Sequence, residues 1–205
     1  TAAHCLRKFD NGTFYDPDEI YIALGAHKLT VRGRLEDRVP VREIYVHPKY
    51  NKPHVRLWAY DMALIRISRV GRFPNASLPA CIPENTLEPH DSQTCIVAGW
   101  GKTADSDYSN SLLQAEIPIV SRADCNVKRY WDNYLDRSML CAGSVRPERS
   151  SCQGDSGGPL MCPRDGRRGD PQQWVLYGVV SWGPIDCGDK PGVYANVAGE
   201  IKWIK

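Results

Sequence analysis

The clearest chemical signal in the chain is the segment Gly154-Asp155-Ser156-Gly157-Gly158-Pro159-Leu160. Three glycines around one serine allow a tight backbone bend and a close approach of substrate. A serine hydroxyl is a weak nucleophile unless a neighbouring base takes its proton, and that base needs a partner that fixes its tautomer. Ser156 is therefore the candidate nucleophile, and its histidine and carboxylate partners must come from elsewhere in the chain.

The order of the histidines excludes one class of hydrolase. The serine segment also contains Gly-x-Ser-x-Gly, the nucleophile elbow of α/β-hydrolases, in which the acid and then the histidine follow the serine. All five histidines precede Ser156; they are His4, His27, His47, His54 and His90. The apolar residues after Gly158-Pro159 also favour a strand, where that fold requires a helix. We therefore expect the order His, Asp, Ser or Asp, His, Ser.

The elements that must position these residues are mainly strands. Short runs rich in β-branched and aromatic residues alternate with Gly, Pro, Asn and Asp, as in an antiparallel barrel or sandwich. We expect strands at 20–24, 39–46, 63–67, 94–98, 112–120, 174–182 and 192–197. Helices are expected at 121–130, with Ser121 as N-cap, and at 197–205. The Pro- and Asn-rich stretch 71–91 is expected to connect two halves.

Composition restricts the class of protein. The net charge of a 205-residue chain is only +2, so no nucleic-acid partner and no direct membrane contact are expected. No apolar run approaches the ~18 residues of a membrane-spanning helix. The 8 cysteines form no Cys-x-x-Cys pair, which favours disulfides over zinc and therefore an oxidising compartment. Sequons at Asn11 and Asn75 predict a glycoprotein and agree with that compartment.

Three segments together resemble a known family. Thr1-Ala2-Ala3-His4-Cys5, Asp61-Met62-Ala63-Leu64-Ile65 and the serine segment resemble the signature segments of the chymotrypsin-like serine peptidases. Ala98-Gly99-Trp100-Gly101, Ser181-Trp182-Gly183 and Pro191-Gly192-Val193-Tyr194 support the resemblance, which covers the chain in the right order.

The resemblance implies an all-β fold of two six-stranded antiparallel Greek-key barrels with a C-terminal helix. Residues 1–205 would be one peptidase domain that lacks its N-terminal segment and its last residues. Within it, 1–80 would form part of the first barrel, and 81–205 the second barrel and the start of the helix.

The same resemblance implies the catalytic roles. Ser156 would attack the peptide carbonyl, His4 would accept and return the proton, and Asp61 would orient His4. The N–H groups of Gly154 and Ser156 would form the oxyanion hole. In the family, activation of a zymogen frees an N-terminal ammonium that pairs with the acid before the nucleophile, here Asp155. Since that N-terminal segment is absent from the sequence, we expect residues 1–205 alone to be inactive.

Substrate preference is also carried over by resemblance. Ser150 and Ser151 would line the floor of the primary pocket, and Gly183 and Gly192 would leave its walls open. An uncharged, deep pocket predicts cleavage after Tyr, Phe, Leu or Met, although Asp186 and Asp189 lie near the pocket in sequence and could attract a basic side chain. The remaining substrate contacts are expected from Ser181, Trp182 and Trp58, the last of which would narrow the neighbouring subsite. The loop after Cys5 predicts restricted specificity.

Eight cysteines allow 105 pairings, and only the resemblance chooses among them. It implies Cys95–Cys162, Cys125–Cys141 and Cys152–Cys187. Cys5 would pair with an upstream cysteine, and Cys81 would tether an upstream propeptide or accessory chain.

The other implied partners are protein or peptide substrates and protease inhibitors. No cofactor is expected: Ala26 replaces the acid of the family's calcium loop, and Pro191 stands where sodium-binding relatives have an aromatic residue. The protein is expected to be secreted or extracellular, which includes the ectodomain of a membrane-anchored protein. The alternative is a catalytically silent, protease-like binding module, which the complete set of three catalytic residues argues against.

Overall fold

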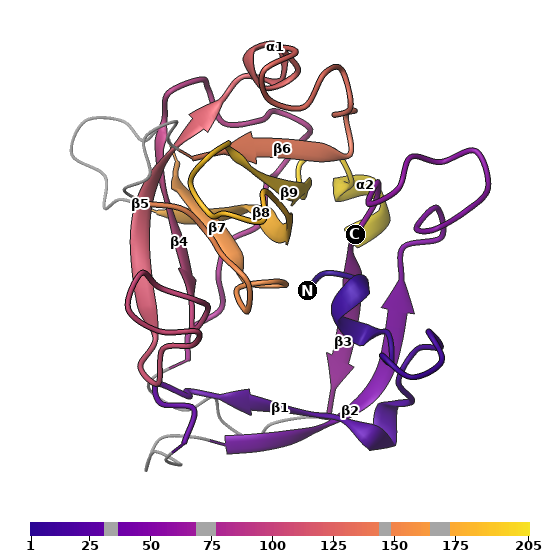
Figure 1. Cartoon of the computed structure of the whole chain (residues 1–205). Coiled ribbons are helices and arrows are strands. Elements are labelled where there is room, and N and C mark those ends of the chain that lie inside the picture. Colours follow the sequence, from indigo (N-terminus) through magenta and orange to yellow (C-terminus); the bar gives the residue numbers. More distant parts are fainter. Residues whose placement is uncertain (31–36, 69–76, 144–148, 165–172) are drawn as a thin grey trace.

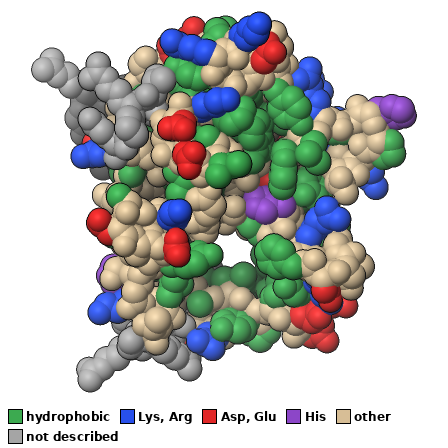
Figure 2. All heavy atoms as spheres, in the orientation of Figure 1, with side chains coloured by type: hydrophobic (Ala, Val, Ile, Leu, Met, Phe, Trp, Pro, Cys, Tyr) green, Lys and Arg blue, Asp and Glu red, His purple; other side chains and the backbone are tan. Residues whose placement is uncertain are grey.

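Two β-sheets and a few short helices make up the described part of the chain. The computed structural model describes residues 1–30, 37–68, 77–143, 149–164 and 173–205 (Figure 1). The first sheet is formed by residues before position 70 and the second by residues after position 90, and the two lie side by side. Figure 2, in the same orientation as Figure 1, shows a hollow between these two halves.

The N-terminal sheet has the order β1-β2-β3 and is antiparallel throughout. Its strands are β1 (Tyr21–Leu24), β2 (Asp37–Val46) and β3 (Ala63–Ile67). Two short 3-10 helices, η1 (His4–Leu6) and η2 (Pro17–Glu19), precede it. The described residues of this half form a three-stranded sheet and not a closed barrel, so the two-barrel architecture and its incompleteness stay predictions.

The second half is a closed antiparallel barrel with the strand order β4-β5-β6-β9-β8-β7. The strands are β4 (Thr94–Gly99), β5 (Leu113–Val120), β6 (Met139–Ala142), β7 (Pro159–Pro163), β8 (Trp174–Trp182) and β9 (Gly192–Asn196). Ile117, Leu160 and Tyr194 fill its interior and are 0% exposed. Closure pairs every strand on both sides and so removes unpaired edges.

Most strand predictions are confirmed to within two residues, but β6 was not predicted. Its four residues, Met139–Ala142, are all buried, so they show no alternation of apolar and polar side chains. A short buried run of this kind cannot be distinguished from helix or loop by periodicity.

Both predicted helices are shorter in the structure. Ser121 is the N-cap of α1 (Arg122–Cys125), since its Oγ accepts from the Asp124 N–H at 3.1 Å. The helix then ends, because the Asn126 side chain instead binds the backbone of Leu135. The second helix, α2 (Ile201–Ile204), begins later than predicted, because Val197 still donates its N–H to the carbonyl of Tyr177 in β8. None of the helices in the described ranges is long and apolar enough to cross a bilayer.

Candidate active site

His4 and Asp61 meet at the junction of the two halves. Asp61 lies just before β3 and is 0% exposed, whereas His4 begins η1 with its neighbour Ala3 buried beneath it. The His4 Nδ1 is 2.7 Å from Asp61 Oδ2, and the His4 backbone N–H donates to Asp61 Oδ1 at 2.9 Å. The contact therefore fixes both the ring and the backbone of His4.

A third donor completes the surroundings of the Asp61 carboxylate. Ser181, in β8, donates its hydroxyl to Asp61 Oδ2 at 2.5 Å, across 120 residues of sequence. Sequence analysis assigned Ser181 only to substrate binding, and nothing in its spacing from Asp61 indicates this bond. Through this bond, β8 of the closed barrel holds the carboxylate that orients His4.

The electrostatic surroundings of His4 favour its charged form. Burial opposes protonation, but the hydrogen bonds to Asp61 and Cys5 and the charges behind them outweigh it and raise the pKa of His4 to about 10. The Cys5 Sγ lies 3.6 Å from His4 Nε2, the ring nitrogen that faces away from Asp61. The contact with Asp61 therefore stabilises the protonated form of the imidazole.

Ser156 lies on an exposed turn between Gly154 and Gly157, whose φ angles are +92° and +79°. Gly157 donates its N–H to the Val180 carbonyl at 2.8 Å, which anchors the turn to β8. A Cβ on Gly157 would lie 3.2 Å from Cys5 Sγ, so the turn packs closely against the segment that carries His4. Within the described residues, however, Ser156 makes no hydrogen bond to His4.

The two backbone donors predicted for the oxyanion hole flank Asp155. The N–H groups of Gly154 and Ser156 donate no hydrogen bond to other described residues of the chain. The carboxylate of Asp155 is itself satisfied, because it accepts from the Gly101 N–H at 2.8 Å and from the Cys152 N–H at 2.9 Å. The first bond links Asp155 to the residues that follow β4, and the second lies within its own turn.

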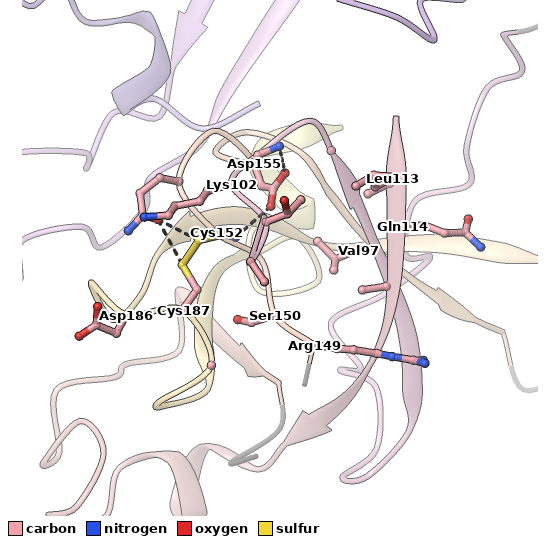
Figure 3. A pocket seen from close by; sticks show the side chains of 18 of the residues that line it. Val97, Lys102, Leu113, Gln114, Arg149, Ser150, Cys152, Asp155, Asp186 and Cys187 are labelled. Carbon is pink, nitrogen blue, oxygen red and sulfur yellow. Dashed lines mark hydrogen bonds between the residues drawn. A yellow bond between two sulfur atoms is a disulfide. The ribbon is translucent and has the colours of Figure 1, made fainter. Parts of the chain in front are cut away.

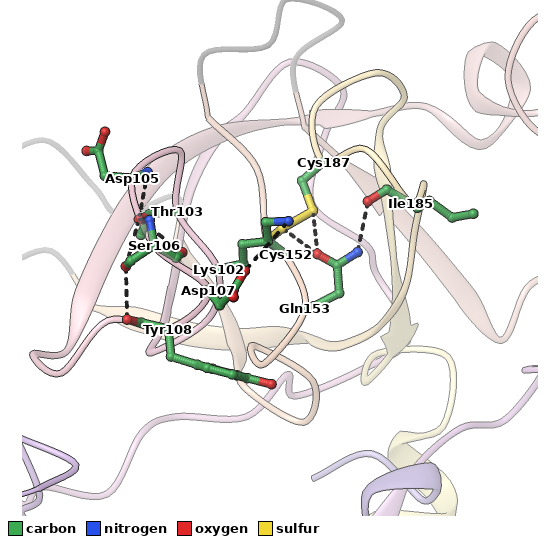
Figure 4. Close-up of polar contacts among 10 residues, drawn as sticks. All are labelled: Lys102, Thr103, Asp105, Ser106, Asp107, Tyr108, Cys152, Gln153, Ile185 and Cys187. Atoms are coloured by element: carbon green, nitrogen blue, oxygen red, sulfur yellow. Dashed lines mark hydrogen bonds and ion pairs between the residues drawn. A yellow bond between two sulfur atoms is a disulfide. The ribbon is translucent and has the colours of Figure 1, made fainter.

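Asp155 lines a cavity of about 520 Å³ (Figure 3). Ser150, Ile185 and Asp186 line the same cavity. The Gln153 side chain closes one edge by donating to the Ile185 carbonyl at 2.9 Å, next to the Cys152–Cys187 disulfide (Figure 4). The predicted floor residue Ser150 and the predicted activation acid Asp155 therefore line one cavity.

The other predicted pocket residues are grouped around Ser151. The Ser151 hydroxyl is 2.9 Å from the Tyr194 hydroxyl, and burial, only partly offset by this hydrogen bond, strongly raises the pKa of Tyr194. A Cβ on Gly192 would be 3.3 Å from Ser151 Oγ, and one on Gly183 would be 3.7 Å from Gly192 Cα. Ser151, Gly183 and Gly192 therefore lie together, and Ser150 adjoins them because its hydroxyl donates to the Ser151 carbonyl at 3.0 Å. Tyr194 was not predicted as part of this group.

Aromatic side chains line the approach to His4. The ring of Trp58 meets the His4 imidazole edge to face at 5.4 Å, on a residue with φ +66°. Trp182 packs against Trp131 at 4.6 Å and against Tyr134 at 5.6 Å between ring centroids. Trp58 and Trp182 were predicted near the cleft, but Trp131 and Tyr134 have no sequence motif that marks them.

The covalent framework agrees with the implied pairing. Disulfides join Cys95 to Cys162, Cys125 to Cys141 and Cys152 to Cys187, and Cys5 and Cys81 are free.

Of the two predicted glycosylation sites, the described part of the chain includes only Asn11. Asn11 is exposed, and its side-chain carbonyl accepts from the N–H of Thr13 at 3.0 Å and from its hydroxyl at 2.7 Å. Asn75 lies outside the described residues. No group of three His, Cys, Asp or Glu side chains suited to a metal occurs in the described ranges, and the absence of a metal stays a prediction.

Comparison with known proteins agrees with this geometry. The family model described as Trypsin matches residues 1–204. Among solved structures, the chain is similar to neuropsin, a serine protease expressed in the limbic system of mouse brain. The two are 33% identical with a TM-score of 0.77, and the match covers 100% of this chain and 81% of the neuropsin chain.

Proposed function

The chain belongs to the trypsin family of serine peptidases and is a serine endopeptidase, and from this premise we propose that it hydrolyses peptide bonds with His4, Asp61 and Ser156 as its catalytic triad. The observation that supports this most is the 2.7 Å contact between His4 Nδ1 and the buried Asp61 carboxylate, next to the Ser156 turn. Such a carboxylate fixes the tautomer of the imidazole and stabilises the imidazolium formed during catalysis.

In the proposed reaction the Ser156 oxygen bonds to the substrate carbonyl carbon while its proton passes to His4 Nε2. His4 then returns the proton to the leaving amine as the peptide bond breaks, which leaves an acyl-enzyme on Ser156. Water hydrolyses this ester with His4 as base again. The N–H groups of Gly154 and Ser156 would stabilise the oxyanion, an effect worth about 3–4 kcal/mol per donor.

We propose that the polypeptide 1–205, in the conformation described above, is not active by itself. The His4 Nε2 faces Cys5 Sγ at 3.6 Å, and within the described residues it makes no hydrogen bond to Ser156 that could pass the proton. Asp155 is bound to two backbone N–H groups and not to an ammonium. Catalysis would require Asp155 to leave these donors for the ammonium of an activated N-terminus, which would bring the Ser156 turn to His4.

The proposed substrate preference is a large apolar residue before the scissile bond. Ser150 and Ser151 offer no charge to a basic side chain, and Gly183 and Gly192 leave the pocket walls without side chains. Trp58 and the aromatic group around Trp182 would contact the residues further from the cleaved bond. These apolar walls favour restricted specificity over broad digestion.

We also propose that the protein is exported and glycosylated. Three disulfides require an oxidising compartment, and the exposed Asn11 presents its amide in a turn that its sequon threonine stabilises. The exposed, unpaired Cys81 is suited to a covalent link with an upstream propeptide or accessory chain. Residues 1–80 and 81–205 would be the two parts of one peptidase domain.

A fluorophosphonate probe tests the proposed nucleophile. A form of the protein that carries the family's activated N-terminal segment should be labelled on Ser156 and should cleave a peptide library after Tyr, Phe, Leu or Met. The matched control is Ser156→Ala, which should abolish labelling. An activated protein that binds peptides but takes no label would instead be the silent binding module.

A further inference from the structure

A buried histidine outside the proposed triad contacts the residues on either side of Asp61. His47 follows β2 and is only 3% exposed. Its ring is enclosed by Tyr60, stacked at 4.9 Å with an interplanar angle of 12°, and by Trp203 of α2, edge-on at 4.7 Å. A buried polar ring of this kind needs hydrogen bonds on both nitrogens.

Both ring nitrogens of His47 have partners, and these define its protonation. The Nδ1 accepts the Lys49 backbone N–H at 3.2 Å, so the ring proton must lie on Nε2. The Nε2 is 3.1 Å from Glu200 Oε2 and donates to it. Burial, aided by the Lys49 charge, lowers the pKa of His47 to about 4, so the ring is neutral and its tautomer is fixed.

His47 contacts both residues that flank Asp61, namely Tyr60 and Met62. Its ring lies flat on Tyr60, and its backbone N–H donates to the Met62 carbonyl at 2.9 Å. Tyr60 has a φ of +56°, a left-handed conformation that side-chain-bearing residues rarely adopt and that their surroundings must therefore stabilise. His47 thus contacts the residues on both sides of Asp61 and stabilises the turn that carries this carboxylate.

Through Glu200 the same residue ties this turn to the C-terminal helix. Glu200 immediately precedes α2, and its side chain is 13% exposed. The Lys49 ammonium lies 4.9 Å from the Tyr60 ring centroid and so adds a second contact to Tyr60. The Asp61 turn is therefore linked to β2 and to the residues at α2, which are far from it in sequence.

We propose that His47 is a positioning residue, which with Glu200 fixes the Tyr60–Asp61–Met62 turn so that the Asp61 carboxylate meets His4. The proposal rests on the role of Asp61 proposed above. In this role the neutral His47 ring acts through its hydrogen bonds, and it touches neither substrate nor the reacting atoms. A purely packing role for the ring is the competing explanation.

An NMR titration of the His4 imidazole distinguishes the two explanations without requiring activity. The Asp61 contact raises the pKa of His4, so a displaced carboxylate lowers it. The variant His47→Phe keeps an aromatic ring against Tyr60 but removes both side-chain hydrogen bonds. We expect it to lower the proton affinity of His4 roughly tenfold or more. His47→Gln, whose amide can donate to Glu200, should restore most of that affinity.

Two further variants keep the test decisive if His47→Phe does not fold. Glu200→Leu removes the acceptor and should also lower the His4 proton affinity, whereas Glu200→Gln keeps an acceptor and should not. His27→Phe, at an exposed histidine, is the control. Folded His47→Phe or Glu200→Leu protein with an unchanged His4 titration would overturn the proposal in favour of packing.

Kinetics of a form that carries the family's activated N-terminal segment give an independent readout. A misplacement of about 1 Å at catalytic groups costs up to roughly 100-fold in rate. We expect His47→Phe to lower kcat by roughly 10- to 100-fold with KM little changed. A rise in KM with unchanged kcat would contradict the proposal. Absence of activity in the unmodified activated protein would instead refute the proposed triad and leave the NMR result standing.

Discussion

The carboxylate of Asp61 accepts hydrogen bonds from the His4 backbone, the His4 ring and the Ser181 hydroxyl. Because Asp61 is buried, its negative charge is screened little by water and acts strongly on the imidazole beside it. At the same time, the second ring nitrogen faces Cys5 and not Ser156. At the scale of single residues, the site therefore has an oriented imidazole without its nucleophile in contact.

This arrangement predicts how the stability of the 205-residue chain depends on pH. The pKa of His4 rises from 6.5 to about 10 on folding, so the folded state binds more protons than the unfolded state between these values. The stabilisation is complete below about pH 6.5 and is lost as the pH rises towards 10. Urea unfolding across this range should show a falling free energy of unfolding. In Asp61→Asn the fall should be clearly smaller, and parallel curves for the two proteins would contradict the assignment.

Ser150 gives a second prediction at this scale, for substrate preference. In the activated protein, Ser150→Asp should place a carboxylate in the cavity and shift cleavage towards Arg and Lys. Pairing of a desolvated charge should change the ratio of kcat/KM for matched Arg and Tyr peptides roughly 100-fold. Ser150→Asn has a similar size without the charge and should keep the apolar preference. Cleavage after Arg or Lys by the unmodified enzyme would show that Ser150 does not set specificity.

Local motifs were enough to nominate His4, Asp61 and Ser156 for the proposed triad, because each stands in a short segment that resembles the family. Contacts made by packing were not predictable in this way. The bond from Ser181 to Asp61 spans 120 residues, and the proximity of Cys5 to His4 Nε2 depends on how η1 lies against the Ser156 turn. Neither depends on a spacing that sequence alone displays.

At the scale of elements, strands were predicted where side-chain chemistry alternates or where long β-branched runs occur. The bounds of β3 and β8 match the prediction, whereas β6, buried on both faces, gave no periodic signal. The predicted helix at 121–130 begins correctly at its Ser121 cap, but hydrogen bonds from Asn126 to Leu135 end it early. Such non-local competition is invisible to local propensity.

The connection from the Ser156 turn into β7 gives a prediction for an element. A Cβ on Gly158 would lie 2.8 Å from the Asp155 carbonyl oxygen and 2.9 Å from that of Ala98, and both are backbone atoms. Gly158→Ala should therefore destabilise the protein by about 1–3 kcal/mol. Gly183→Ala is the matched control, because its nearest neighbour would be Gly192 Cα at 3.7 Å, an ordinary contact. Its free energy of unfolding should change by about 0.5 kcal/mol at most, and equal losses in both variants would contradict the steric argument.

At the scale of the whole molecule, the two halves are stabilised differently. The three disulfides all lie between Cys95 and Cys187, in and around the closed barrel. The N-terminal sheet is open, and β1 alternates only between exposed and half-buried residues. The proposed catalytic residues are divided between these halves, so the site depends on noncovalent contacts such as Asp61 with Ser181 and His47 with Glu200.

This asymmetry predicts that the 205-residue chain opens locally before it unfolds. Native-state hydrogen exchange should give a lower opening free energy for amides in β1, β2 and β3 than for those in β4 and β9. Since one disulfide typically contributes about 2–4 kcal/mol, the difference should be at least about 2 kcal/mol. Adding a reductant should narrow the difference, because it removes cross-links only from the barrel. One shared opening free energy for both halves, unchanged by the reductant, would mean that they unfold as a single cooperative unit. Opening of the N-terminal sheet would carry away His4 and Asp61 while the barrel keeps Ser156 in place, so loss of the site should precede loss of the fold.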